Sequence, residues 1–288
     1  MQNVLSVKGL VKKYPTFELK NINFEIPEGC IVGFIGGNGH GKTTTIRTIL
    51  GLAKKDAGTV EIFEKNFEQH EKEIRDRMGV VFDETYLYEN LTMKQMKDLV
   101  KGAYSKWDDS VYRDYMKRFE LDEKQKIGKL SKGMKMKYSL ALALSHHAEL
   151  LIMDEPTSAL DPYVRKEILD ILREYMEKEG KCVFYSTHIT SDLDKIADMI
   201  VFIEKGEILF VEDKDVLLDK YKRVKGDVCH LDERLKGLFL SLTITQFGFE
   251  GVTENELILK ENIPNLVVEK VNIEDIMLAQ IERGKCYD

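Results

Sequence analysis

The segment GGNGHGKTTT, residues 36–45, places four glycines directly before a lysine and a run of threonines. Its start fits the pattern G-x-x-x-x-G-K-[ST], in which glycines let the backbone curl so that several N–H groups point at a phosphate. Lys42 is then expected to reach the β- and γ-phosphates, and the Thr43 hydroxyl to help hold Mg²⁺. A dinucleotide-binding loop is excluded because it needs glycine where Lys42 stands. We therefore expect a nucleoside triphosphate to be bound by Gly36, Gly37, Asn38, Gly39, His40, Gly41, Lys42, Thr43 and Thr44.

Two further segments carry groups suited to the same chemistry. In LLIMDEPT, four apolar residues lead to Asp154 and Glu155 at the end of a predicted buried strand. Asp154 is suited to binding Mg²⁺, and Glu155 to polarising a water molecule against the γ-phosphate. In KLSKGMKMKY, Ser131 and Gly133 precede a helix and form a second potential anion site. Taken alone, Asp154 and Glu155 also fit a solvated loop, but they follow a phosphate loop in the chain. Ser131 alone also fits an ordinary helix cap, but it stands shortly before LLIMDEPT.

The elements that position these residues alternate between strands and helices. Apolar patterns predict strands over residues 4–14, 17–26, 30–36, 58–64, 77–83, 149–154 and 181–187, and a hairpin over 199–211. Helices are expected over 42–52, 133–147, 161–180 and 189–198, with a helical, polar insert at 91–127. This order indicates an α/β core with a largely parallel sheet. Residues 220–288 are expected to form a small α+β appendage with strands at 238–249 and 256–261 and a closing helix at 273–284.

Composition limits the class of protein. The 288 residues are 43% hydrophobic and 32% charged, which is typical of a globular chain with a buried core. The net charge of −7 does not favour a nucleic-acid partner. We expect no signal peptide and no transmembrane helix. The four scattered cysteines, which are Cys30, Cys182, Cys229 and Cys286, are expected to be reduced thiols of a cytosolic protein.

Together these motifs resemble the ATP-binding cassette subunit of an ABC transporter, over about residues 3–215. The Walker A motif is GGNGHGKT, the signature is LSKGM, Walker B is LLIMDE, the D-loop is SALD, and the switch histidine is His188 in STHIT. Tyr14 matches the aromatic residue that stacks on adenine in the family. The resemblance implies a P-loop NTPase cassette: a RecA-like core with an antiparallel β subdomain and a helical subdomain at about 88–140. We expect an ATPase domain at 1–219 and a regulatory or dimer-stabilising domain at 220–288.

The resemblance also implies the roles of residues. Lys42, Glu155, His188 and Asp83 are expected to serve catalysis, and Thr43, Asp83 and Asp154 to hold Mg²⁺. Ser131 and Gly133 would contact ATP bound to a second subunit in a head-to-tail dimer. The second subunit would be another copy of this chain or a homologous cassette. Asp161 would link the two ATP sites. Five positions depart from the family pattern: Met134 stands where glutamine is usual, His40 where a small residue is usual and Gly37 where proline is usual, and the other two are Asp83 and Lys132. Asp83 stands where glutamine is usual, and Lys132, where glycine is usual, either adds a cation near the phosphate or is merely solvated; we favour solvation.

The signature, Asp83 and the appended tail are similar to cassettes of ABC-2-type exporters, including those linked to bacitracin-like resistance and antimicrobial-peptide export. This implies an ATPase on the cytoplasmic membrane face that drives a separate permease exporting a peptide, antibiotic or lipid-like substrate. A regulatory ATPase of DNA repair or translation would carry long coiled coils or two cassettes, and neither is present in the sequence. A sensory switch with little net transport remains an alternative.

Overall fold

The computed structural model describes residues 2–83 and 86–285, with the side chains of 284 and 285 left out. Its chain forms two compact units. The first contains residues 1–189 and 199–211, and the second contains residues 190–198 and 212–288. The helix that follows His188 is thus grouped with the C-terminal segment, although it lies within the predicted ATPase domain.

The first unit contains an antiparallel sheet built from the N-terminal strands. The strand order is β2-β1-β4-β5, where β1 is Asn3–Tyr14, β2 is Phe17–Pro27, β4 is Ala57–Ile62 and β5 is Lys65–Asn66. Alternate residues in the second half of β2, namely Ile22, Phe24 and Ile26, are buried. That alternation of buried and exposed positions is typical of a sheet with one face on the core.

A six-stranded sheet forms the centre of the first unit, with the order β10-β9-β3-β8-β7-β6. Its strands are β3 (Ile31–Ile35), β6 (Met78–Phe82), β7 (Leu150–Asp154), β8 (Cys182–Thr187), β9 (Met199–Glu204) and β10 (Glu207–Asp213). The pairs β6–β7, β7–β8, β8–β3 and β3–β9 are parallel. All residues of β3, β7 and β8 are buried, as expected for a parallel sheet covered on both faces. The predicted α/β class with a P-loop cassette is confirmed by this architecture.

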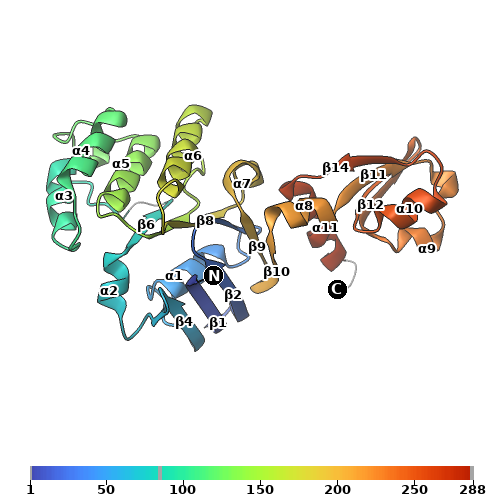
Figure 1. The fold of residues 1–288 in the computed structure, drawn as a ribbon, viewed down its shortest axis with the longest axis horizontal. Helices are drawn as coiled ribbons and strands as arrows, with labels where there is room; N and C mark the ends of the chain where they lie inside the picture. The colour runs from blue at the N-terminus through green and yellow to red at the C-terminus, as the bar shows by residue number, and fades with distance from the viewer. Residues whose placement is uncertain (1, 84–85, 286–288) are drawn as a thin grey trace. The chain divides into compact units, whose positions relative to one another are not determined.

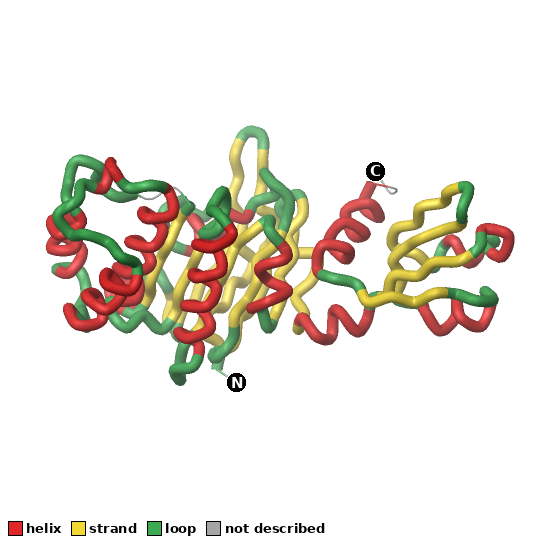
Figure 2. Tube along the Cα trace, turned by 90° about the horizontal axis from the view of Figure 1, so that it is seen from above, coloured by secondary structure: helices red, strands yellow, loops and turns green. Residues whose placement is uncertain are grey.

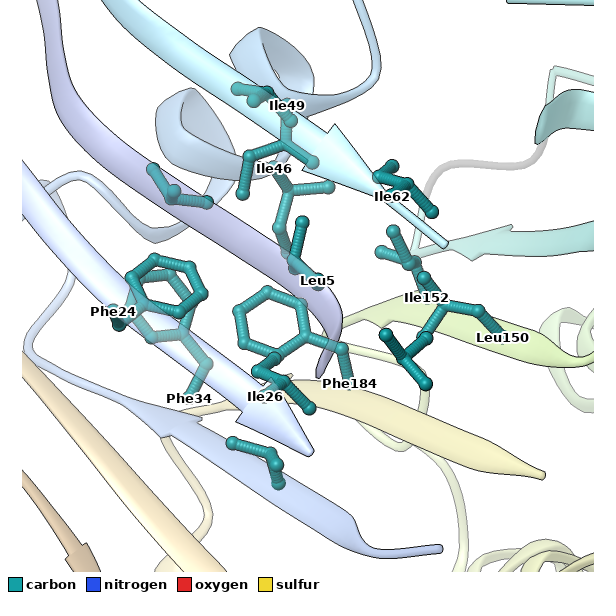
Figure 3. Close-up of a cluster of buried hydrophobic side chains, with 14 of the residues drawn as sticks. Leu5, Phe24, Ile26, Phe34, Ile46, Ile49, Ile62, Leu150, Ile152 and Phe184 are labelled. Carbon is teal, nitrogen blue, oxygen red and sulfur yellow. The ribbon is translucent and has the colours of Figure 1, made fainter. Parts of the chain in front are cut away.

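One apolar core joins the two sheets to helix α1 (Lys42–Ile49). Figure 3 shows Ile46 and Ile49 of α1 near Leu5 and Ile62 of the antiparallel sheet, with Phe184, Leu150 and Ile152 of the parallel sheet nearby. Phe184 stacks on Phe24 and on Phe34, with ring centroids 5.6 and 5.1 Å apart. Because both sheets pack on α1, the loop that precedes this helix has a fixed position.

Besides α1, the described part of the first unit contains five further α-helices, and Figure 2 shows red helices beside the yellow strands. The five are α2 (Glu71–Asp76), α3 (Met93–Lys101), α4 (Asp109–Arg118), α5 (Lys132–Leu144) and α6 (Pro162–Met176). The insert helices α3, α4 and α5 lie side by side (Figure 1). The start of α6 is confirmed: Asp161 caps it and Pro162 is its first residue, although the helix ends before Gly180.

The second unit is built on an antiparallel sheet with the order β12-β13-β11-β14. Its elements are α7 (Thr190–Ile196), α8 (Lys214–Lys220), β11 (Lys222–Gly226), α9 (Glu233–Lys236), β12 (Phe239–Thr245), β13 (Gly248–Thr253), α10 (Glu256–Asn262), β14 (Val267–Lys270) and α11 (Ile273–Lys285). The closing helix is confirmed as α11. The expected strand at 256–261 is wrong, because this segment is helix α10, and the expected strand at 238–249 is divided into β12 and β13.

Among the described residues, no helix combines the length and the apolar character needed to cross a membrane.

Candidate nucleotide site

A pocket of about 600 Å³ lies at the carboxyl ends of the parallel strands in the first unit. Ligands of open α/β sheets bind at this edge because the loops that follow the strands converge there. The described lining residues come from the tip of the β1–β2 hairpin, the loop after β3 and the ends of β6, β7 and β8: Tyr14, Pro15, Thr16, Phe17, Gly37, Asn38, Gly39, Gly41, Lys42, Thr43, Thr44, Asp83, Glu155, Ser158 and His188.

The loop before α1 depends on glycine at its closest approaches. Gly41 has φ +111°, and a Cβ there would lie 2.8 Å from side-chain atoms of Phe17 and Leu19. A Cβ on Gly36 would lie 2.4 Å from the Ile203 carbonyl oxygen. Helix α1 follows at once, and Gly41 offers its first turn no side-chain cap. The free N–H groups of that turn are therefore available to a phosphate.

Lys42 is held inside this loop. Its side chain is 6% exposed, and Nζ donates to the carbonyl oxygens of Gly36 at 2.8 Å and Gly37 at 3.2 Å. Nζ also lies 3.3 Å from Oε1 of Glu155. The ammonium group is thus positioned by two loop carbonyls and one carboxylate at the bottom of the pocket.

Glu155 and His188 form the second pair of contacting side chains in the pocket. The His188 Nδ1 atom lies 2.7 Å from Glu155 Oε2, and the His188 backbone N–H donates to the same oxygen at 3.3 Å. Glu155 has φ +51° and its backbone N–H donates to Ser186 at 2.9 Å. A non-glycine residue in the left-handed region is strained, and such residues cluster at functional sites. The strained backbone directs the carboxylate between Lys42 and His188.

Asp154 lies at the end of β7 and is 5% exposed. Burial raises its pKa, and the hydroxyl of Thr43 acts against this rise. Its Oδ1 atom is buried and has no hydrogen-bond partner among the described residues. A buried carboxylate oxygen without a partner, beside a threonine hydroxyl, fits an oxygen-binding cation such as Mg²⁺.

Asp83 follows β6 and lies beside Asp154, since its backbone N–H donates to the Asp154 carbonyl oxygen at 2.8 Å. Its side chain lines the pocket, as expected. Its Oδ1 atom lies 2.5 Å from Nζ of Lys132. Lys132 is 43% exposed, as expected for a solvated lysine, and its ion pair with Asp83 is a further contact that the sequence did not predict. Two of the positions that depart from the family pattern, Asp83 and Lys132, thus contact each other.

The other predicted residues divide into two groups. Tyr14 lines the pocket and is 46% exposed, so its ring is available for stacking. Ser131 and Gly133 are not among the described lining residues of the pocket in their own chain. They lie at the start of α5, where the Ser131 hydroxyl accepts from Met134 N at 3.2 Å.

His40 has a partner that the sequence did not indicate. Its Nδ1 atom lies 2.5 Å from Oε2 of Glu204, at the end of β9. This contact ties the middle of the glycine-rich loop to a neighbouring strand. Only the adjacency of β3 and β9 in the sheet could have identified Glu204, because the two residues lie far apart in the chain.

The fold and the pocket define a phosphate-loop nucleotide-binding protein. The family model described as ABC transporter matches residues 19–158. The bacitracin transport ATP-binding protein BcrA of Bacillus licheniformis is 35% identical over 213 residues, which cover 73% of this chain and 69% of that protein. The lantibiotic transport ATP-binding protein SrtF of Streptococcus pyogenes is 32% identical, with 74% of this chain and 92% of that protein covered.

Solved structures agree with these relatives. A structure titled as the ATP-binding subunit of an ABC transporter has a TM-score of 0.68 and 27% identity, covering 74% of this chain and 91% of that one. A dimeric ATP-binding cassette in a post-hydrolysis state, bound to ADP and Pi, has a TM-score of 0.65 and 27% identity, covering 73% of this chain and 98% of that one. The chain belongs to the ABC transporter ATP-binding proteins and is an ATPase.

Proposed function

We propose that the chain is the motor subunit of an exporter, and that it binds and hydrolyses Mg-ATP in the pocket beside Lys42. The observation that carries this proposal is the convergence of Lys42, Glu155 and His188 around one pocket, with Glu155 within 3.3 Å of both other side chains. A cation for the phosphates, a carboxylate base and a polar group that orients it are the parts that phosphoryl transfer to water requires.

Each side chain has a distinct role in this reaction. Lys42 binds the β- and γ-phosphates, with the free N–H groups at the start of α1. Glu155 accepts a proton from the attacking water, and His188 holds the Glu155 carboxylate and contacts the γ-phosphate. Thr43, Asp154 and Asp83 are the residues that would hold Mg²⁺. When bound, Mg²⁺ offsets the charge that develops on the phosphate oxygens. Tyr14 stacks on the adenine ring.

We further propose that two copies, or this chain and a homologous cassette, dimerise head to tail. Ser131 and Gly133 then contact the nucleotide in the partner's pocket. Two observations support this arrangement: these residues do not line the pocket of their own chain, and they begin a 13-residue helix whose N-terminal end attracts anions. The dimeric form of the similar cassette bound to ADP and Pi is consistent with it.

The partner in the membrane is proposed to be an ABC-2-type permease, with the cassette on the cytoplasmic face. The named bacitracin and lantibiotic transport relatives support an exporter of a peptide, antibiotic or lipid-like substrate. The alternative is a sensory ATPase with little net transport. It predicts nucleotide-dependent signalling from the same pocket without movement of a substrate.

The test is to purify the tagged chain from its native membranes and identify the membrane protein that accompanies it. The complex is then reconstituted in vesicles and assayed for ATP hydrolysis and for transport of bacitracin and a lantibiotic. We expect hydrolysis that a Lys42→Ala complex lacks, together with transport of at least one peptide. Hydrolysis with no transport of either peptide would exclude these two peptides as substrates, and hydrolysis with no transport of any peptide, antibiotic or lipid tested would favour the sensory alternative. No hydrolysis by the intact complex would refute the proposed function.

A further inference from the structure

The start of helix α5 carries three lysines, and each is paired with a carboxylate from outside the helix. Lys132 lies 2.5 Å from Asp83, Lys135 lies 2.7 Å from Glu89, and Lys137 lies 2.6 Å from Glu167. The first turn of α5 contains no acidic residue. A cation at a helix N-terminus is unfavourable because it faces the positive end of the helix dipole. The external carboxylates offset this cost.

The Lys132–Asp83 pair differs from the other two in what it connects. Among the three carboxylate residues, Asp83 is the one found among the described lining residues of the nucleotide pocket. Lys132 lies between Ser131 and Gly133, the residues proposed to contact the partner's nucleotide. One ion pair therefore joins the pocket of a chain to the surface that serves the second pocket of a dimer.

The pair is suited to being broken and remade. Its side chains are 43% and 34% exposed, and exposed ion pairs are weak. Asp83 Oδ1 is shielded from solvent and has no well-aligned hydrogen bond among the described residues, so charge attraction holds it to the ammonium. A divalent cation offers the same oxygen a stronger attraction. A divalent cation at Asp83 Oδ1 would therefore compete with the Lys132 ammonium for this oxygen.

We propose that Lys132 and Asp83 form an electrostatic switch that couples the two nucleotide sites. Without nucleotide, Lys132 occupies the Asp83 carboxylate of its own chain. Mg-ATP in that chain's pocket competes for the carboxylate and releases Lys132. The freed ammonium, at the start of α5, then adds to the attraction for the partner's γ-phosphate. This inference rests on the proposed head-to-tail dimer and deepens it, because nucleotide in one pocket primes the surface used by the other.

The switch predicts opposite effects from one substitution. Lys132→Met removes the competitor for Asp83, so the single chain binds Mg-ATP more tightly, by about fivefold, which converts to roughly 1 kcal/mol. The affinity for ATP in the presence of a chelator stays unchanged, because no divalent cation is then available to bind the Asp83 carboxylate. Lys132→Met also weakens the ATP-bound dimer, because the cation that faces the partner's phosphate is gone. A purely structural lysine would shift the chelated and Mg²⁺ affinities alike.

The experiment uses the full chain with Glu155→Gln, so that bound ATP is not hydrolysed. Affinity for a fluorescent ATP analogue is measured with Mg²⁺ and with a chelator, at a protein concentration where light scattering shows a monomer. Dimer formation is then followed by light scattering at higher concentration. Lys135→Met is the matched control, since it removes an ion pair from the same helix without touching a pocket residue. Lys135→Met is expected to leave the ATP affinities, with Mg²⁺ and with chelator, at the values of the starting protein. Lys132→Arg is expected to restore those values.

The outcomes separate the inference from the proposed function. If the starting protein binds no Mg-ATP, the proposed function itself fails. If it binds Mg-ATP but Lys132→Met and Lys135→Met behave alike, the switch is wrong and the function stands. Should Lys132→Met not fold, Lys132→Gln serves in its place. Asp83→Asn provides a second test. When it is combined with the Lys132 variant, the gain in Mg-ATP affinity must disappear. A gain that persists would also overturn the switch.

Discussion

Replacing Glu155 with glutamine tests the chemistry of the pocket most directly. Glutamine keeps the length of the side chain and an oxygen acceptor for the His188 backbone N–H, which donates to Glu155 at 3.3 Å. It removes the negative charge that lies 3.3 Å from Lys42 Nζ. We therefore expect hydrolysis and ATP binding to respond in opposite directions.

The magnitudes follow from these contacts. Loss of a general base lowers turnover by about 10²- to 10⁴-fold. At the 3.3 Å separation of Lys42 and Glu155, two unit charges attract by roughly 5 kcal/mol at an effective dielectric constant of about 20. In the parent protein, a bound triphosphate must attract Lys42 away from the Glu155 carboxylate, and it is repelled by the negative charge of that carboxylate. Lys42 retains two carbonyl partners in the variant. Only part of this attraction appears in the free energy of ATP binding. We therefore expect the variant to bind ATP up to about tenfold more tightly.

Turnover is measured by phosphate release, and ATP affinity is measured by calorimetry. Light scattering detects the ATP-bound dimer, which should accumulate in the variant. Glu149→Gln is the matched control because Glu149 directly precedes β7, whereas Glu155 directly follows it. Glu149 accepts from Arg77 Nε at 3.0 Å and is absent from the described lining of the pocket. Its variant should hydrolyse ATP at the parent rate. A Glu155→Gln protein that matches the parent rate, or that no longer binds ATP, would refute the assignment of Glu155 as the base.

Three further outcomes are expected. Lys42→Ala removes the buried cation of the phosphate loop and should weaken ATP binding by about 100-fold or more, measured by calorimetry, as befits charge-assisted hydrogen bonds; near-normal affinity would contradict its role. Asp83→Gln restores the usual family residue and should keep ATPase activity within about tenfold, or roughly 1.4 kcal/mol of barrier, whereas Asp83→Ala should lose much of its turnover; equal rates for the parent and the alanine variant would make Asp83 a bystander. Tyr138→Phe removes the buried hydroxyl that donates to Met93 at 2.6 Å and should lower the free energy of unfolding by about 1–3 kcal/mol, seen in denaturant titration; an unchanged midpoint would show that the carbonyl finds another partner.

Most residues that line the proposed nucleotide pocket could be predicted because they are local in the chain. A run of eight residues from Gly36 to Thr43 contains the glycines that the turn requires, the lysine and the start of the helix. Asp154 and Glu155 likewise follow directly on a strand whose apolar residues predict burial. Backbone geometry over a few consecutive residues decides such motifs, so their spacing carries the information.

The C-terminal unit was harder to predict because its short apolar runs fit either a strand or a helix. In α10, Leu259 is buried in the core of that unit, while Leu257 and Ile258 are 69% and 45% exposed. Three adjacent apolar residues suggested a strand, but only one of them packs inward. The residues that cover Leu259 come from other elements, so tertiary packing decided the helix.

The sequence by itself determined the chemistry that we propose for this protein: a phosphate loop, a carboxylate suited to binding a metal and a carboxylate suited to acting as a base, in an order typical of one family. The tertiary structure alone decided which charges meet. It brings His40 to Glu204 through adjacent strands of one sheet, and Lys132 to Asp83 where the start of α5 meets the end of β6. Long, flexible side chains reach partners that no local spacing specifies, because electrostatic contacts depend on distance in space and not on position in the chain.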